Sequence, residues 1–156
     1  MVRSCTALLV LLAVNAAQAQ SDPDPLAAFS DPAQMPVYFE MLTRLKVAVE
    51  KTSGDHAATY KAVGLRLFGC SQTYVRLARQ AELDAPARAR YASSGELYAH
   101  AAAGLYPDSL AELREDYANS LRKKEHKPGL YSPRVCDAFS DANFDTVYNG
   151  VRDLAP

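Results

Sequence analysis

Residues 60–81 read YKAVGLRLFGCSQTYVRLARQA, and this stretch has the clearest periodicity in the chain. Its apolar and aromatic side chains recur at alternating steps of three and four residues: Tyr60, Val63, Leu67, Cys70, Tyr74, Leu77 and Ala81. This spacing places them on one face of an α-helix, and a face of this length packs against a partner helix. We therefore expect an amphipathic helix within a bundle, with the Cys70 thiol pointing inward.

The segments on both sides repeat the helical pattern between recognisable caps. We expect further helices over residues 37–51, 85–105, 110–122 and 133–154, with a less regular stretch at 141–143. Asp84 and Ser109 are suited to cap helices, as is Ser53 or Asp55, and Ser109 forms a capping box with Glu112. No alternating run is long enough for a strand, so the sequence predicts an all-α bundle of about five helices.

The first residues have the layout of a secretory signal peptide. Arg3 supplies a basic start, residues 7–17 are apolar apart from Asn15, and Ala17-Gln-Ala19 is an A-x-A cleavage site. The apolar run is shorter than the about 20 residues that cross a bilayer, so we expect export without a membrane anchor. The domain prediction is a signal peptide over 1–19, an extended leader over 20–36 and one helical domain over 37–156, located in the periplasm.

Composition excludes several classes of protein. The chain has 156 residues with 17 Lys+Arg against 18 Asp+Glu, a formal net charge of −1. Nucleic-acid binders usually carry a basic excess, so we expect no nucleic acid as partner. The apolar content of 49% is too high for a disordered acidic tail.

Export also suggests a role for the cysteines that remain after cleavage. Cys70 and Cys136 lie in an oxidising compartment, where two cysteines most often pair, and we predict a structural disulfide between them. The alternative is a reactive thiol with His56, His100 or His126 as its base.

Common catalytic and metal-binding motifs are missing from the sequence. It contains no C-x-x-C-H haem motif, no H-E-x-x-H zinc motif, no G-x-S-x-G elbow and no glycine-rich phosphate loop. Glu112, Glu115 and Asp116 cluster on one predicted helix, where the helix dipole attracts acidic residues anyway. We expect no cofactor and no metal, and we do not predict an enzyme.

The strongest candidate for a contact surface is the connection between the last two predicted helices. It combines a basic run, a Pro-Gly corner and an aromatic residue, and its candidate residues are Arg122, Lys123, Lys124, His126, Lys127 and Tyr131. Loops carried on a rigid scaffold often hold functional residues, although a solvated helix end would look similar. Tyr106 and Tyr131 both sit in turns, where a tyrosine serves either as an interface anchor or as local packing.

Three short motifs resemble a known family. They are Leu67-Phe-Gly-Cys70, Ser94-Gly-Glu-Leu-Tyr98 and Cys136-Asp-Ala-Phe139, in an exported helical chain. This arrangement is similar to the periplasmic immunity proteins that neutralise type VI secretion amidase effectors. The resemblance implies a protein that occupies the active-site groove of a secreted cell-wall amidase, with Cys70 and Cys136 as a structural pair.

Two other functions remain open at this point. One is a periplasmic chaperone or envelope-assembly factor that binds exposed apolar segments. The other is a small hydrolase that uses the carboxylates around Glu112 and Asp116. The sequence also leaves open whether two copies form a homodimer.

Overall fold

The computed structural model describes residues 29–123 and 131–156, and all regular structure in these ranges is helical. The helices are α1 (Gln34–Glu50), α2 (His56–Ala78), α3 (Ala85–Leu105), α4 (Leu110–Arg122), α5 (Pro133–Asp137) and α6 (Phe144–Arg152), with a 3-10 turn at Ala138–Ser140. The predicted all-α bundle is confirmed. The expected signal peptide at 1–19, the leader up to residue 28, and Lys124, His126 and Lys127 lie outside the described residues.

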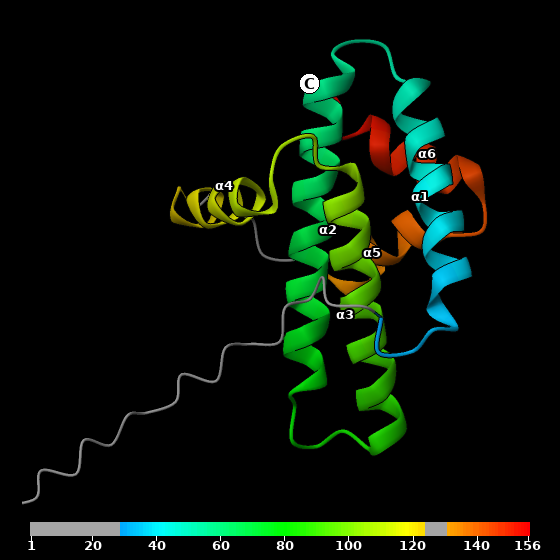
Figure 1. Ribbon diagram of the computed structural model, residues 1–156, viewed down its shortest axis with the longest axis vertical. Coiled ribbons are helices and arrows are strands. Elements are labelled where there is room, and N and C mark those ends of the chain that lie inside the picture. Colours follow the sequence, from blue (N-terminus) through cyan, green and yellow to red (C-terminus); the bar gives the residue numbers. More distant parts are fainter. Residues whose placement is uncertain (1–28, 124–130) are drawn as a thin grey trace, which may run out of the picture.

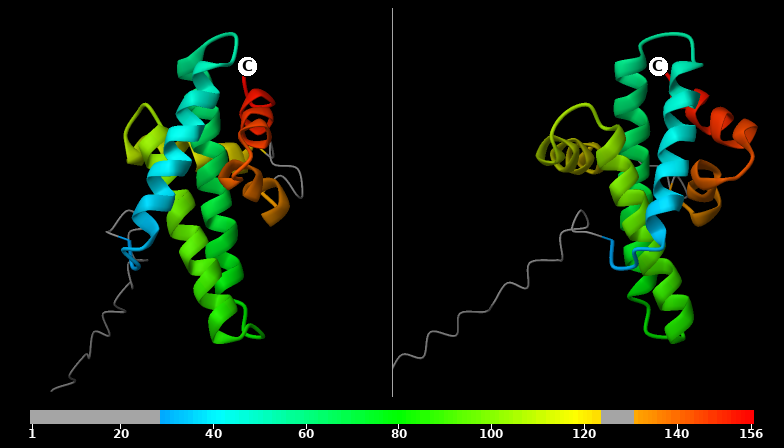
Figure 2. Two further views of the ribbon diagram at one scale, coloured as in Figure 1. Left: turned by 90° about the vertical axis from the view of Figure 1, so that its right-hand side faces the viewer. Right: turned by 45° about the vertical axis from the view of Figure 1, so that its right-hand side comes forward.

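The long helices α2 and α3 form an antiparallel hairpin around which the other elements are arranged (Figure 1). α1 packs against α3 and α6, α5 packs against α2, and α4 stands out from the side of the bundle (Figures 1 and 2). Small residues allow the hairpin to close tightly: a Cβ added at Gly95 would lie 3.1 Å from Cγ2 of Val75. No helix in the described ranges is long and apolar enough to span a bilayer.

The predicted disulfide joins α2 to α5. The Cα atoms of Cys70 and Cys136 are 5.6 Å apart, and both residues are completely buried. Beside them, the hydroxyl of Tyr98 donates to the carbonyl oxygen of Cys136 at 2.9 Å, and Tyr74 donates to Asp137. The rings of these two tyrosines are stacked with centroids 5.4 Å apart. Covalent, polar and aromatic contacts therefore hold α5 at one place on α2.

Most of the predicted caps are confirmed. Asp55 accepts from the amides of Ala57 and Ala58, and Asp84 accepts from the amide of Ala87. Ser109 and Glu112 form both hydrogen bonds of a capping box. Each cap satisfies amide groups that the first turn of a helix leaves unpaired.

Three helix boundaries differ from expectation. α2 ends at Ala78, so Ala81, the last residue of the expected stripe, lies beyond it. The helix expected over 133–154 is divided at its less regular stretch, 141–143, because Asp141 accepts from the amide of Asn143 at 2.7 Å and Asn143 caps a new helix. α1 begins at Gln34, three residues before the expected start, because a turn at Asp31 leads into it and Pro36 is tolerated in a first turn.

The residues that precede α1 lie against α3. The ring of Phe29 stacks on His100 with centroids 4.0 Å apart. Ser30 donates both its amide and its hydroxyl to Glu96, and Gln34 bonds Ser93. The described end of the expected leader is thus tied to the bundle by stacking and by hydrogen bonds.

Candidate functional site

A polar cluster attaches α4 to α2. The ammonium of Lys61 on α2 lies 2.8 Å from Oδ2 of Asp116 and 3.4 Å from Oδ2 of Asp108. The hydroxyl of Tyr106 donates to the same oxygen of Asp116 at 2.5 Å. A single carboxylate therefore accepts one hydrogen bond from α2 and another from the turn before α4.

Tyr106 is buried, so it cannot serve as the exposed turn tyrosine that the sequence allowed. Only 6% of its surface is accessible, and its ring covers Gly64 of α2. A Cβ at position 64 would lie 2.9 Å from Cδ2 of Tyr106, so a glycine is needed for this contact. The turn between α3 and α4 consequently folds onto α2 instead of extending into solvent.

The electrostatics of this cluster follow from its hydrogen bonds. Bonds from Lys61 and Tyr106 hold the pKa of Asp116 below its usual value, and bonds from Ser109 lower the pKa of Glu112. Burial, with the hydrogen bond to Asp116, raises the pKa of Tyr106 to about 12. Two of the three carboxylates that a hydrolase would use are therefore engaged in fixing and capping α4.

α4 lies at the side of the hairpin (Figure 1). The helical spacing of its apolar residues predicts an inward stripe of Leu110, Leu113, Tyr117 and Leu121. Only Leu113 is fully buried, whereas Leu121 is 48% exposed, so the prediction is wrong for Leu121. Residues 116–120 are half-buried, whereas residues 121–123 at the end of α4 are exposed, so the apolar stripe ends in solvent.

Tyr131 lies flat on α2, in the space that a side chain at Gly69 would occupy. The guanidinium of Arg66 is 5.5 Å from the centre of its ring, and the ring of Tyr117 from α4 is 6.2 Å away. Tyr117 in turn meets Phe68 edge to face. Burial raises the pKa of Tyr131 to about 12, so it stays neutral and keeps its hydroxyl proton at physiological pH.

We call Arg66, Tyr117, Arg122, Lys123 and Tyr131 the tyrosine–arginine surface. Arg122 and Lys123 are exposed at the end of α4, and Arg122 donates to Asn119. Of the predicted contact residues, the structure thus places Tyr131 on α2 and leaves Arg122 and Lys123 in solvent. Tyrosine and arginine are enriched at the centres of protein–protein interfaces.

Sequence reasoning missed the contributions of Arg66, Gly69 and Tyr117 to this surface. The helical spacing of Tyr117 predicts a core residue, and Arg66 lies off the apolar stripe of residues 60–81. A signal existed at Gly69, because a glycine inside a strongly periodic helix often marks a place where another group approaches closely. Which residue makes that approach is a long-range fact that the local pattern does not contain.

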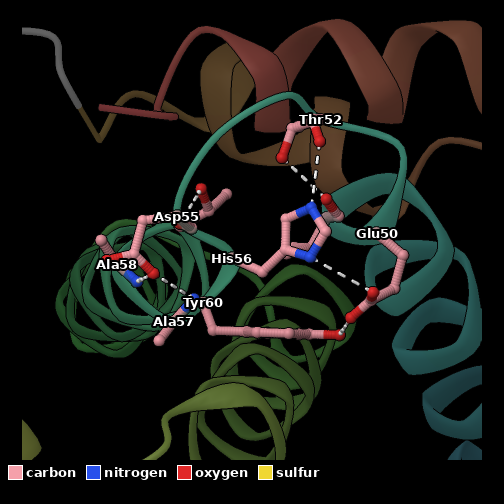
Figure 3. Close-up of polar contacts among 9 residues, drawn as sticks. Glu50, Thr52, Asp55, His56, Ala57, Ala58 and Tyr60 are labelled. Carbon is pink, nitrogen blue, oxygen red and sulfur yellow. Dashed lines mark hydrogen bonds and ion pairs between the residues drawn. The ribbon is translucent and has the colours of Figure 1, made fainter.

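A second polar cluster closes the turn between α1 and α2 (Figure 3). Nδ1 of His56 lies 3.3 Å from Oε2 of Glu50, and Nε2 lies 3.0 Å from the carbonyl oxygen of Thr52. The hydroxyl of Tyr60 donates to the other carboxylate oxygen of Glu50 at 2.9 Å. The hydroxyl of Thr52 is bonded to the carbonyl of Val49 and not to His56, so the cluster aligns no nucleophile and acts as a clamp.

The cysteines and the other histidines do not form the alternative thiol site. Cys70 and Cys136 are bonded to each other, and His100 packs between Phe29 and Tyr38. His126 lies outside the described residues. Within residues 29–123 and 131–156, no group of three or more His, Cys, Asp or Glu side chains could hold a metal ion.

α1 exposes several large apolar side chains. They are Met35, Val37, Phe39 and Val47. They are interspersed with charged residues such as Lys46 and the ion pair between Glu40 and Arg44. The exposed side of α1 is therefore a second region of the molecule on which another chain could pack.

Comparison with protein-family models, with curated proteins and with solved structures finds no match for the chain.

Proposed function

We propose that this chain is an exported inhibitor that binds a secreted peptidoglycan amidase and blocks its active site sterically, as a type VI immunity protein does. The observation that carries the proposal is the position of Tyr131. It lies on Gly69, next to the half-cystine Cys70, and the disulfide at Cys70 stabilises the support beneath it. The tyrosine–arginine surface is therefore offered by a rigid scaffold.

Rigidity favours tight binding in this proposal. A side chain that is already held in place loses little conformational entropy when a partner covers it. Tyr131 is held between Gly69, Arg66 and Tyr117, so its contribution to the binding free energy is reduced little by lost side-chain entropy. Arg122 and Lys123 would increase the rate of encounter with an acidic rim around the enzyme's groove.

The mechanism needs no chemistry from the inhibitor. A groove that accepts a wall peptide would be closed when the exposed end of α4 and Tyr131 occupy it. Glu112 caps α4 and Asp116 attaches α4 to α2. Both carboxylates therefore have a structural role in the proposed contact surface, which agrees with an inhibitor that performs no catalysis. The predicted signal peptide at 1–19 would bring the inhibitor to the compartment where the amidase acts.

The test begins with identification of the partner. The full chain with a C-terminal tag is expressed and exported in its own cells, captured, and the bound proteins are identified by mass spectrometry. The captured amidase is then assayed on purified peptidoglycan with and without the inhibitor. Stoichiometric capture of one amidase and its complete inhibition would support the proposal, whereas capture of an amidase that stays active would contradict it.

The contact surface is tested with charge reversal. Arg122→Glu with Lys123→Glu should weaken inhibition about tenfold, because the rim charges would then repel an acidic groove. Lys46→Glu with Arg152→Glu, on exposed positions of α1 and α6, makes the same change of charge elsewhere and should leave inhibition unchanged. Equal effects of the two double variants would exclude the tyrosine–arginine surface.

A second candidate function is supported by the exposed apolar side chains of α1. An envelope chaperone would use Met35, Val37 and Phe39 to bind unfolded apolar segments weakly and without selectivity. Capture of many substoichiometric envelope proteins, lost in Phe39→Ser, would favour this function over the inhibitor.

A further inference from the structure

The end of the α2–α3 hairpin extends beyond every other described element of the bundle (Figures 1 and 2). We call residues 76–92 the finger; it contains the last turn of α2, the connection to α3 and the first turns of α3. Neither α1, α4, α5 nor α6 reaches its tip in these views. The conformation of the finger therefore depends on the packing of α2 against α3 alone, and its outer surface faces solvent.

The finger has a defined shape. The carboxylate of Asp84 caps α3 by accepting from the amide of Ala87 at 2.7 Å, and the guanidinium of Arg88 donates to the carbonyl oxygen of Leu83 at 3.3 Å. On the α2 side, the amide of Gln80 donates to the carbonyl oxygen of Leu77 at 3.0 Å. These bonds tie the connection to both helix ends, so a partner would meet a preorganised element.

The finger is basic in a chain that is slightly acidic. Four exposed arginines stand against two acidic residues; the arginines are Arg76, Arg79, Arg88 and Arg90, and the acidic residues are Glu82 and Asp84. The whole chain carries a formal net charge of −1, so the basic excess of the finger is balanced elsewhere. The other exposed residues around the arginines are mostly alanines, which leave the guanidinium groups accessible.

The arrangement of the arginines indicates the shape of the partner. Arg88 and Arg90 are two residues apart on α3, which places them about 200° apart around the helix axis. They cannot both face one flat surface, but they can reach the two walls of a cleft. None of the large apolar side chains that are exposed in the described ranges lies on the finger, so it lacks the groups that would insert into a lipid surface.

We propose that the finger is a second contact site, which inserts between the carboxylates of an acidic protein cleft. Guanidinium groups bind carboxylates through two parallel hydrogen bonds, which fits arginines on both sides of a narrow element. The proposal rests on the proposed function in one respect, since the cleft is assigned to the amidase that the chain inhibits. The finger and the tyrosine–arginine surface would then contact the same enzyme at two points.

The first experiment tests the finger without the amidase. The purified protein is titrated with poly-L-glutamate at low salt, and backbone amide shifts are followed by NMR. We expect shifts that are confined to residues 76–92, and affinity that falls about tenfold in Arg88→Glu with Arg90→Glu. The control, Lys46→Glu with Arg152→Glu, should bind poly-L-glutamate as the unchanged chain does.

Several outcomes would overturn the proposal. Shifts outside the finger, no shifts at all, or equal losses in the two double variants would show that the finger does not recognise carboxylates selectively. Tighter binding of double-stranded DNA or of phosphatidylglycerol vesicles at the same total charge would indicate a phosphate-bearing partner instead. If the double variant loses helical signal in circular dichroism, Arg90→Glu alone replaces it, because Arg90 is exposed and the carbonyl of Leu83 keeps its bond from Arg88.

The second experiment separates the two proposals. The captured amidase is inhibited by the unchanged chain and by the finger variant at several salt concentrations. Slower association with a smaller dependence on salt is expected for the variant. If the variant associates as the unchanged chain does, the finger is not part of the interface, and the proposed inhibitor function is unaffected. If the unchanged chain does not inhibit the amidase, the inhibitor function is wrong. The poly-L-glutamate titration then still tests whether the finger binds carboxylates.

Discussion

α5 and α4 are two short helices that pack on the same long helix, and they are held there in different ways. α5 is joined to α2 by a buried disulfide and by Tyr74, which donates to Asp137, and Tyr98 of α3 donates to Cys136. α4 is held mainly by one buried leucine and by a polar cluster around Lys61, whose side chain is 43% exposed. Covalent and buried contacts fix an element throughout the native state, whereas exposed polar contacts leave it able to open locally. Within the tyrosine–arginine surface, Arg122 and Lys123 on α4 are therefore held less firmly than Tyr131, which lies on α2 beside the disulfide.

The largest expected effect is loss of the disulfide. Cys70→Ser with Cys136→Ser removes a crosslink between residues 66 apart, and the chain-entropy model assigns about 4 kcal/mol to a loop of that size. The midpoint of urea denaturation should fall accordingly, and the amides of α5 should lose protection from hydrogen exchange before those of α3. An unchanged midpoint would mean that the packing of Tyr74 and Tyr98 alone fixes α5.

Gly69→Ala should have the next largest effect. The new Cβ would overlap the ring of Tyr131, and relief of that overlap costs about 1–3 kcal/mol or displaces the tyrosine from α2. The ring signals of Tyr131 in NMR should change more than those of Tyr98. Gly150→Ala is the matched control, because its Cβ would lie 3.4 Å from Cε1 of Phe139, an ordinary contact.

The sequence predicts what is local and misses what depends on distant partners. The helical periods and the Asp55, Asp84 and Ser109 caps are determined by neighbouring residues, and all were found. The pairing of Cys70 with Cys136 was predictable because two cysteines in a chain expected to be exported usually pair. The sequence left the role of Tyr106 open, because its burial depends on Gly64, 42 positions earlier. Tyr131 shares a surface with Arg66 only through the fold.

Lys61→Met should loosen α4 with little effect on global stability. Both partners of the pair are more than one third exposed, and such pairs contribute under about 1 kcal/mol. Hydrogen exchange in α4 should accelerate while exchange in α5 stays unchanged. Lys46→Met on α1 serves as the control, and faster exchange in both helices would show that α4 is not an independent unit.

The smallest expected effect is a selective response of α4 to acid. The pKa of Asp116 is held below its ordinary value of 3.8 by Lys61 and Tyr106, and Ser109 lowers the pKa of Glu112 in the same helix. A carboxyl whose pKa is lower in the folded state contributes stability above its unfolded pKa and loses it as the pH falls through the folded pKa. NMR signals of α4 should therefore broaden or shift below about pH 4, while those of α5, which the disulfide holds, stay in place. Asp116→Asn should reduce the pH dependence of the α4 signals, and Asp145→Asn on α6 should leave it unchanged. Simultaneous changes in the signals of α4 and α5 would show that acid opens the whole bundle and that the two helices are equally stable.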